Sequence, residues 1–470
     1  MKTFLFYDLE TSGLNKAFDQ VMQFAAIRTD ENLNEIERHE ELVKLNPDVI
    51  PSPHALITHR ISIQQARQGL CEYEAIHRIH EWINNQNTIS IGYNTLGFDD
   101  EFLRFSFYKN LLPPYSHQYA NGCGRIDLYP MATMYYLFQH DVIDWPLIDG
   151  KSTLKLEQLS LKNNLAIGMA HDAMVDVEAT IALAKKFKSK SEMWNYLCGY
   201  FDKETDIARS IKLPIAFANY QLALLVDGSF GANNKYHSAA LSLGNHYHYR
   251  NQTLWLRLDD PKLLDATKDN FNETAWMTHK KIGGKNLILP FTDRFTKHID
   301  SDRQTIINEN MLFLKSNSKL LHEISEYHRN YTYPTIPDLD VDAALYQNDF
   351  PTNYETQLCN DFHIAPINKK YEVINRMLNQ NLKTQMIRVL ARNYPEYLPE
   401  KYKDEFETFI EDACSNKPIT DYRGQPRMTI QQAQFDINNI EKNNMLDEQQ
   451  KKILCDAKKE LTQYGCVANN

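Results

Sequence analysis

The sequence lacks several features that mark specialised classes of protein. No stretch approaches the ~18 consecutive apolar residues that a membrane-spanning helix needs. Asp8 and Glu10 interrupt the short apolar run at the N-terminus, so we expect no secretion signal. The seven cysteines are odd in number and form no C-x-x-C pair, which argues against a disulfide framework or a zinc site and indicates the reducing cytoplasm. Internal repeats and low-complexity tracts are also missing.

An excess of basic residues is missing as well. The chain has 51 basic and 61 acidic side chains and a formal net charge of −10. This total argues against a nucleic-acid partner, because such proteins usually carry a basic footprint. The net charge is a sum over the chain, however, whereas a binding groove is local. Residues 1–190 hold 18 basic and 24 acidic side chains, a net charge of −6, so most of the net negative charge lies in the first part of the chain.

The pattern of apolar residues divides the chain into three predicted domains. Residues 1–190 alternate between strands, expected at 4–8, 23–28, 36–45 and 88–93, and helices, expected at 73–83, 101–108 and 173–187, which favours a mixed α/β sheet. Residues 191–345 contain short strand-like segments separated by turn residues, and we expect a small, largely β domain with some helix. Residues 331–351 suggest an extended connector. Residues 346–470 have helical periodicity, with helices expected at 371–391, 402–413, 429–439 and 446–461.

Two carboxylates lie together at the end of the first predicted strand. Asp8 and Glu10 are two residues apart, so their side chains point to the same face. Two neighbouring anions resist ionisation unless a cation lies between them. Carboxylate oxygens are the hard ligands that Mg²⁺ and Mn²⁺ prefer. The alternative interpretation is a solvated strand end without a ligand.

Two further groups of acids extend this pattern. Asp99 and Asp100 follow Phe98 at the start of a predicted helix, where a single Asp would ordinarily be an N-cap. His171 precedes the helix 173–187, with Asp172 as its natural cap and Asp176 one turn inside. Each residue alone has an ordinary structural explanation. The combination of an acid pair, a distant acid, and a His followed five residues later by an acid is far more specific.

These motifs resemble a known family. The order D-x-E-T, N-x-x-x-F-D and H-D-A-x-x-D is similar to the DEDD exonuclease superfamily with a ribonuclease-H-like fold, in its histidine-bearing subgroup. Within it, FLFYDLETSG, GYNTLGFDDEFLR and AHDAMVDVEATIALAK resemble the bacterial exodeoxyribonuclease I family. The motifs cover residues 1–190 densely, and the length and three-part layout extend the resemblance over the whole chain.

The resemblance implies a set of catalytic residues. Four carboxylates would surround two Mg²⁺ ions, with Mn²⁺ as a substitute, and a histidine would act as general base; on this chain these are Asp8, Glu10, Asp99, Asp176 and His171. Glu10 would also face the terminal 3′-OH. Asp99 fits the family pattern because it directly follows Phe98, and Asp100 remains an alternative ligand.

Substrate contacts are implied less specifically. Lys155, Arg104, Tyr115 and Tyr119 fall at positions that resemble DNA contacts of the family, and Arg125 is a weaker candidate. In the alternative interpretation, the basic residues are ordinary exposed charges on helices, and the tyrosines are partly buried loop residues. Thr133 stands where the family often has Arg, which leaves the details of strand contact open.

The resemblance predicts a processive 3′→5′ exonuclease that degrades single-stranded DNA to 5′-mononucleotides, in DNA repair and recombination. It implies a DEDD exonuclease domain (1–190), an SH3-like domain (191–345) and a helical C-terminal domain (346–470). It also implies a cytoplasmic monomer that binds single-stranded DNA and the acidic C-terminal tail of single-stranded-DNA-binding protein. The alternatives are a 3′ exoribonuclease of the same superfamily, a nucleic-acid-binding module with a vestigial site, and a structural α/β protein whose acids are solvated caps.

Overall fold

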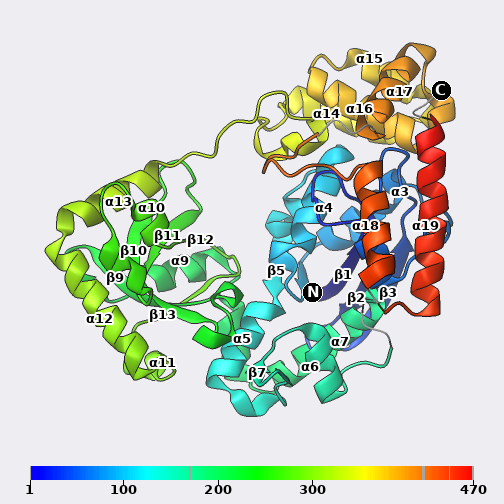
Figure 1. Ribbon diagram of the computed structural model, residues 1–470. Helices are drawn as coiled ribbons and strands as arrows, with labels where there is room; N and C mark the ends of the chain where they lie inside the picture. The colour runs from blue at the N-terminus through cyan, green and yellow to red at the C-terminus, as the bar shows by residue number, and fades with distance from the viewer. Residues whose placement is uncertain (1, 169–170, 415–418, 444, 468–470) are drawn as a thin grey trace. The chain divides into compact units, whose positions relative to one another are not determined.

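The computed structural model describes residues 2–168, 171–414, 419–443 and 445–467 (Figure 1). The chain divides into two compact units, each built from separate segments. The first comprises Met1–Arg125, Ile167–Glu178 and Thr335–Asn470, and the second Ile126–Ala166 and Ala179–Pro334. No helix among the described residues is both long enough and apolar enough to cross a membrane.

A five-stranded sheet is the framework of the first unit. Its strands are β1 (Thr3–Thr11), β2 (Val21–Thr29), β3 (Glu35–Leu42), β4 (Thr88–Gly92) and β5 (Gly124–Asp127), in the order β3-β2-β1-β4-β5. Strand β1 pairs antiparallel with β2 and parallel with β4, so the mixed α/β sheet predicted from the sequence is confirmed. Every residue of β2 is buried, whereas β3 is largely exposed or half-buried.

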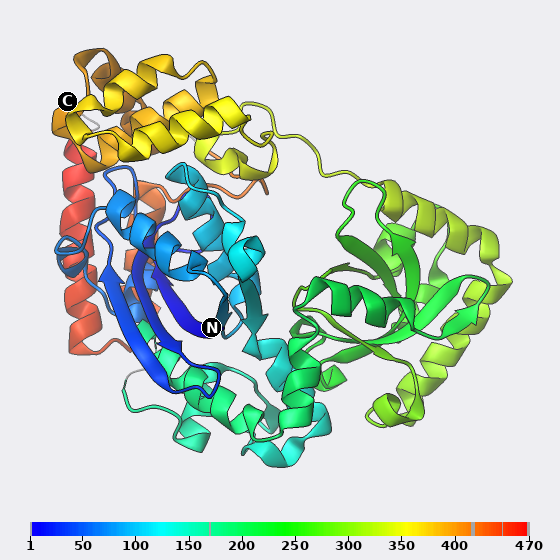
Figure 2. The same ribbon diagram turned by 180° about the vertical axis from the view of Figure 1, so that it is seen from behind.

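The helices of the first unit come from both ends of the chain. They are α1 (Pro53–His59), α2 (Ile63–Ala66), α3 (Glu72–Asn84), α4 (Asp99–Lys109), α7 (Ala173–Lys188, whose first turns belong to this unit), α14 (Asn353–Ile364), α15 (Lys370–Arg376), α16 (Gln380–Asn393), α17 (Glu400–Cys414), α18 (Ile430–Asn443) and α19 (Glu448–Val467). Apolar residues of α3 and α4, such as Ile76 and Phe102, share a core with Leu5 and Phe24 of the sheet. Figures 1 and 2 show α18 and α19 side by side, and their apolar faces pack against α1 and α2.

The single helix predicted over 371–391 is wrong. The structure has two helices there, α15 and α16, separated at 377–379. The side chain of Asn379 accepts hydrogen bonds from the backbone N–H groups of Asn381 and Leu382, so it caps a new helix. The predicted connector 331–351 is only partly extended, since it contains the 3₁₀-helix η8 (Val341–Tyr346), whose Ala343 and Leu345 are buried.

The second unit combines antiparallel sheets with flanking helices, and its helices hold more residues than its strands, so it has the strands that the sequence predicts for the middle of the chain and more helix than expected. Its sheet has the order β12-β11-β10-β9-β13, with β8 paired to β9. The strands of this sheet are β8 (Ile215–Phe217), β9 (Tyr220–Val226), β10 (His237–Asn245), β11 (Gln252–Arg257), β12 (Met277–Lys281) and β13 (Leu287–Pro290). Two short strands, β6 (Leu147–Ile148) and β7 (Lys151–Ser152), form a separate antiparallel pair. The helices are α5 (Leu128–Phe138), α6 (Leu156–Asn163), α8 (Ser191–Cys198), α9 (Lys203–Ile211), α10 (Phe271–Thr274), α11 (Asp293–Thr296), α12 (Ser301–Ser316) and α13 (Ser318–Asn330).

Candidate active site

Strand β1 presents the first two carboxylates of the site. Tyr7 and Leu9 are buried in the core of the first unit, while Asp8 and Glu10 alternate with them and are half-buried. The period of two along a strand therefore places both carboxylates on the face opposite this core. Asp8 pairs with Ala25 and Glu10 with Gln23 of β2, and the register shifts directly after Glu10, where the regular strand ends.

The start of helix α7 brings a histidine and a third carboxylate to Glu10. Asp172 caps the helix, because its Oδ1 accepts hydrogen bonds from the backbone N–H of Met174 (3.0 Å) and Val175 (3.4 Å). The Oδ2 atom of Asp176 accepts the backbone N–H of His171 at 3.3 Å. Ligand atoms of Glu10, His171 and Asp176 all lie within 4.8 Å of one another. His171 has a left-handed backbone (φ +65°), which is uncommon for a residue other than glycine and is often found at functional sites.

Helix α4 contributes the fourth carboxylate, and the four acids act on one another electrostatically. Burial raises the pKa of Asp8 well above its usual value, and the charges of Asp99, Glu10 and Asp176 raise it further. Burial, followed by the charges of Asp176, Asp99 and Asp172, raises the pKa of Glu10 to about 9. Divalent cations relieve such mutual repulsion among carboxylate oxygens, so the residues present fit hard metal ions.

Asp100 has different neighbours from Asp99. Its Oδ1 lies 2.8 Å from Nε2 of His117, and its Oδ2 accepts hydrogen bonds from Nη1 of Arg125 (2.6 Å) and Nη2 of Arg104. Burial opposes ionisation of Asp100, but the charges of Arg125 and Arg104 outweigh it and hold the pKa well below its usual range. Of the two alternatives that the sequence leaves open, Asp99 is therefore the one whose charge acts on the β1 carboxylates.

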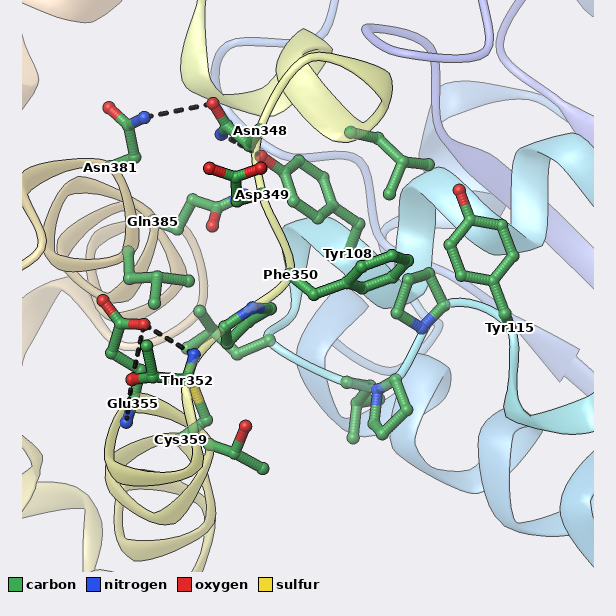
Figure 3. Close-up of a pocket in the computed structure, with 18 of the residues that line it drawn as sticks. Tyr108, Tyr115, Asn348, Asp349, Phe350, Thr352, Glu355, Cys359, Asn381 and Gln385 are labelled. Carbon is green, nitrogen blue, oxygen red and sulfur yellow. Dashed lines mark hydrogen bonds between the residues drawn. The ribbon is translucent and has the colours of Figure 1, made fainter. Parts of the chain in front are cut away.

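Three of the four expected substrate contacts lie near one another in the first unit. The Arg104 guanidinium carbon lies 5.7 Å from the ring centroid of Tyr115. Tyr115 and Tyr119 line a cavity of about 650 Å³, and the Tyr115 ring meets that of Phe350 edge-on at 6.1 Å (Figure 3). Lys155 belongs to the second unit, where it is exposed at the N-terminus of α6.

The sequence did not reveal several residues of this region. His117 and the cavity-lining side chains of the C-terminal segment, among them Asn348, Phe350 and Gln385, have no local motif. They join the site only through contacts between distant segments. His59 at the end of α1 is another such residue: burial is the main cause that lowers its pKa to about 4, and the charge of His171 adds to this effect.

Comparisons with known proteins indicate the family of this chain. The Exonuclease family model matches residues 5–184, and the Exonuclease I C-terminal domain model matches residues 339–466. The chain is 35% identical over 288 residues to Exodeoxyribonuclease I of Buchnera aphidicola subsp. Acyrthosiphon pisum, covering 61% of this chain and 68% of that protein. It is 29% identical over 457 residues to Exodeoxyribonuclease I of Escherichia coli K12, covering 92% of this chain and 94% of that protein.

Solved structures of Exonuclease I have the same fold as this chain. The fold superimposes on Exonuclease I from Methylocaldum szegediense with a TM-score of 0.86 and 25% identity, over 99% of this chain and 100% of that one. The structure of E. coli Exonuclease I in complex with a 5cy-dA13 oligonucleotide matches with a TM-score of 0.86 and 23% identity, over the same shares of the two chains. With its paired acids on β1, its histidine-led helix α7 and these relatives, the chain belongs to the exodeoxyribonuclease I family of the DEDD exonuclease superfamily.

Proposed function

We propose that the protein is a 3′→5′ exonuclease that degrades single-stranded DNA processively to 5′-mononucleotides, in DNA repair and recombination. The observation that carries the proposal is that four carboxylates gather at one place and their charges raise the pKa values of two of them. Those two, Asp8 and Glu10, lie on strand β1, and the other two, Asp99 and Asp176, lie in the first turns of α4 and α7. A structural protein gains nothing from four carboxylates that oppose one another's ionisation. Family membership, and relatives whose structures are described with bound oligonucleotides, support the choice of substrate.

The activity depends on a divalent metal ion, and we propose that the four carboxylates hold two Mg²⁺ ions, with Mn²⁺ as a substitute. Bound divalent ions supply charge that neutralises the phosphodiester and stabilises both the attacking and the leaving oxygen. All four proposed ligands are carboxylates, the donors that Mg²⁺ prefers.

We assign His171 the role of general base. It lies at the edge of the acid cluster, where its imidazole would take a proton from the attacking water. Glu10 faces the terminal 3′-OH in this proposal. An internal nucleotide offers no such hydroxyl, so this contact would restrict cleavage to the 3′ end.

The strand contacts proposed are Arg104, Lys155, Tyr115 and Tyr119. Basic groups follow the phosphates of a single strand, and aromatic rings stack on its bases without regard to sequence. The cavity beside Tyr115 offers apolar and amide side chains suited to a base (Figure 3). We also propose that the protein works as a cytoplasmic monomer and binds the acidic C-terminal tail of single-stranded-DNA-binding protein.

A digestion with matched substrates tests the function. Single-stranded DNA, RNA of the same sequence, and blunt duplex DNA are incubated with the protein and Mg²⁺, each with a free 3′-OH and with a 3′-phosphate. We expect 5′-mononucleotides from single-stranded DNA with a free 3′-OH, and much slower reaction in every other arm. Faster digestion of RNA would instead support the exoribonuclease alternative, and cleavage of the blocked DNA at full rate would contradict end recognition through Glu10.

A further inference from the structure

Three consecutive acids open helix α4, and each has a different environment. Asp99 acts on the β1 carboxylates, and Asp100 binds His117, Arg104 and Arg125. Glu101 accepts hydrogen bonds from the hydroxyl of Tyr422 (2.7 Å) and from Nη2 of Arg423 (2.9 Å). Successive side chains of an α-helix point about 100° apart, so three consecutive residues can contact three different surroundings. Asp100 is therefore fixed next to a proposed metal ligand without facing the metal site itself.

Asp100 gathers groups from three elements. Arg104 lies one turn along α4, Arg125 is on β5, and His117 is on the 3₁₀-helix η2 (Ser116–Gln118). The Asp100 side chain is 1% exposed, and those of Arg104 and Arg125 are 13% and 16% exposed. Both guanidinium groups bind the same oxygen, so without this carboxylate two cations would repel each other in a poorly solvated place.

The arginines keep donors for another anion. A guanidinium carries five N–H donors in a rigid plane. The hydrogen bonds to Asp100 use one terminal nitrogen of each arginine, and Arg104 also donates to the hydroxyl of Tyr346, so neither arginine has used all its donors. Arg104 also faces the ring of Tyr115, which lines the cavity described above. The cluster thus links the helix start that carries Asp99 with the aromatic cavity.

We propose that Asp100 is a positioning residue that holds Arg104 and Arg125 as a fixed pair for a backbone phosphate of the single strand beside the metal site. This inference rests on the proposed function, because it requires single-stranded DNA to bind beside Asp99. A pair of guanidiniums fixed in advance loses less side-chain entropy on binding than two free arginines would. Asp100 itself touches neither metal nor DNA.

The test compares Asp100→Asn with wild type, since Asn keeps the shape of the side chain and removes its charge. We expect KM for single-stranded DNA to rise about tenfold, with kcat changed less than about threefold, because charged hydrogen bonds of this kind are worth at least that factor. Mn²⁺ affinity, measured by titration calorimetry, should stay at the wild-type value, whereas Asp99→Asn should weaken it.

A double-mutant cycle shows whether Asp100 acts through its partners. Arg125→Gln should also raise KM, and the double variant Asp100→Asn/Arg125→Gln should be little worse than the more impaired single variant. Additive effects would mean that Asp100 does not work through Arg125. Unchanged or tighter DNA binding by Asp100→Asn would show that the carboxylate only neutralises the arginines, and would overturn the proposal.

Asp48→Asn is the matched control for loss of a buried, arginine-bound carboxylate. Asp48 is 1% exposed and accepts hydrogen bonds from Arg392 (2.8 and 2.9 Å) and Arg427 (2.8 Å). It should lower the melting temperature and leave KM unchanged at temperatures where the variant is folded. If wild type fails to digest single-stranded DNA, the proposed function fails; if wild type digests it and Asp100→Asn keeps the wild-type KM, only the present inference fails.

Discussion

Four carboxylates of this protein form two groups according to the charges beside them. Asp48 and Asp100 lie among arginines, and although burial opposes ionisation, these cations hold both pKa values below their usual range. Asp8 and Glu10 lie among other acids, so burial and repulsion both raise their pKa values. The charges named beside the second group are all negative, so a bound cation would balance them, and for that reason this group is the better candidate for metal binding.

Metal binding should release protons from this second group. In the folded, metal-free protein the pKa of Glu10 is raised to about 9 and that of Asp8 is raised as well, so this group of carboxylates keeps at least one proton at pH 7. A metal ion requires the ionised carboxylate and displaces that proton. We expect titration calorimetry with Mn²⁺ at pH 7 to show release of at least about one proton, as a difference in heat between PIPES and Tris buffers, which differ in their heats of ionisation.

The release should shrink as the pH rises toward and beyond 9, because Glu10 then ionises without the metal. Glu10→Gln should lower the proton release at pH 7. A binding heat that does not depend on the buffer would contradict the electrostatic description of the site.

His171→Ala tests the general base. Loss of such a base typically lowers kcat about 10²–10⁴-fold, and we expect a value in that range. Affinity for Mn²⁺ and for single-stranded DNA should be retained, and the exposed His54→Ala is the control. Wild-type turnover would remove His171 as the base, and a marked loss of Mn²⁺ affinity would make it a metal ligand, since its ring lies close to Glu10 and Asp176.

The sequence predicts some individual residues much better than others. Asp8 and Glu10 could be paired because a strand has a period of two, and Asp172 could be predicted as a cap because it directly precedes a strong helix. The choice between Asp99 and Asp100 depends on which of them meets Arg125 and His117. Those partners come from β5 and η2, and nothing in the local sequence places them there.

At the scale of elements, the periodic segments of residues 1–190 were predictable, whereas the equally amphipathic helices α9 and α13 in the middle of the chain were not predicted. The strands β1 to β4 and helices α3, α4 and α7 lie where apolar spacing indicates them. Helix α5 was missed because nearly all its residues are buried, so its sequence has no polar face to reveal a helical period. The break between α15 and α16 was missed because its cause, a capping Asn379, is an ordinary polar residue in sequence.

Helices α3, α14 and α15 meet around two half-buried histidines, His77 and His363. The Tyr73 hydroxyl lies 2.9 Å from Nδ1 of His363, and Lys370 donates to the same hydroxyl at 3.2 Å. The ring centroids of His77 and His363 lie 4.5 Å apart. Burial is the main cause that lowers the pKa of His77 to about 3 and that of His363 to about 4.

These histidines should make the protein less stable in acid. Their folded pKa values lie below the usual ~6.5, so between pH 6.5 and 4 the unfolded chain binds protons that the folded chain does not. The free energy of unfolding therefore falls as the pH drops through this window. Urea unfolding at pH 7.5, 5.5 and 4.5 should show a shallower pH dependence for His77→Gln, and an unchanged one for His54→Gln; equal slopes for wild type and His77→Gln would refute this explanation.

For the molecule as a whole, the net charge of −10 no longer argues against DNA. Residues 1–190 carry 18 basic and 24 acidic side chains, and four of those acids are the proposed metal ligands. Two divalent ions add four positive charges at that place, which offsets most of the local excess. We infer that the acidity reflects the need for metal ions, while arginines and aromatic rings near the site supply the strand contacts.

The central claim is that Asp8, Glu10, Asp99 and Asp176 bind the metal ions for removal of nucleotides from 3′ ends. The most direct measurement is the digestion of a 5′-labelled single-stranded DNA by wild type with Mg²⁺, by wild type with EDTA, and by Asp8→Asn with Mg²⁺. We predict progressive shortening from the 3′ end in the first reaction, none in the second, and a rate on the order of 10³-fold lower in the third. Digestion at the wild-type rate in EDTA, or by Asp8→Asn, would contradict the account.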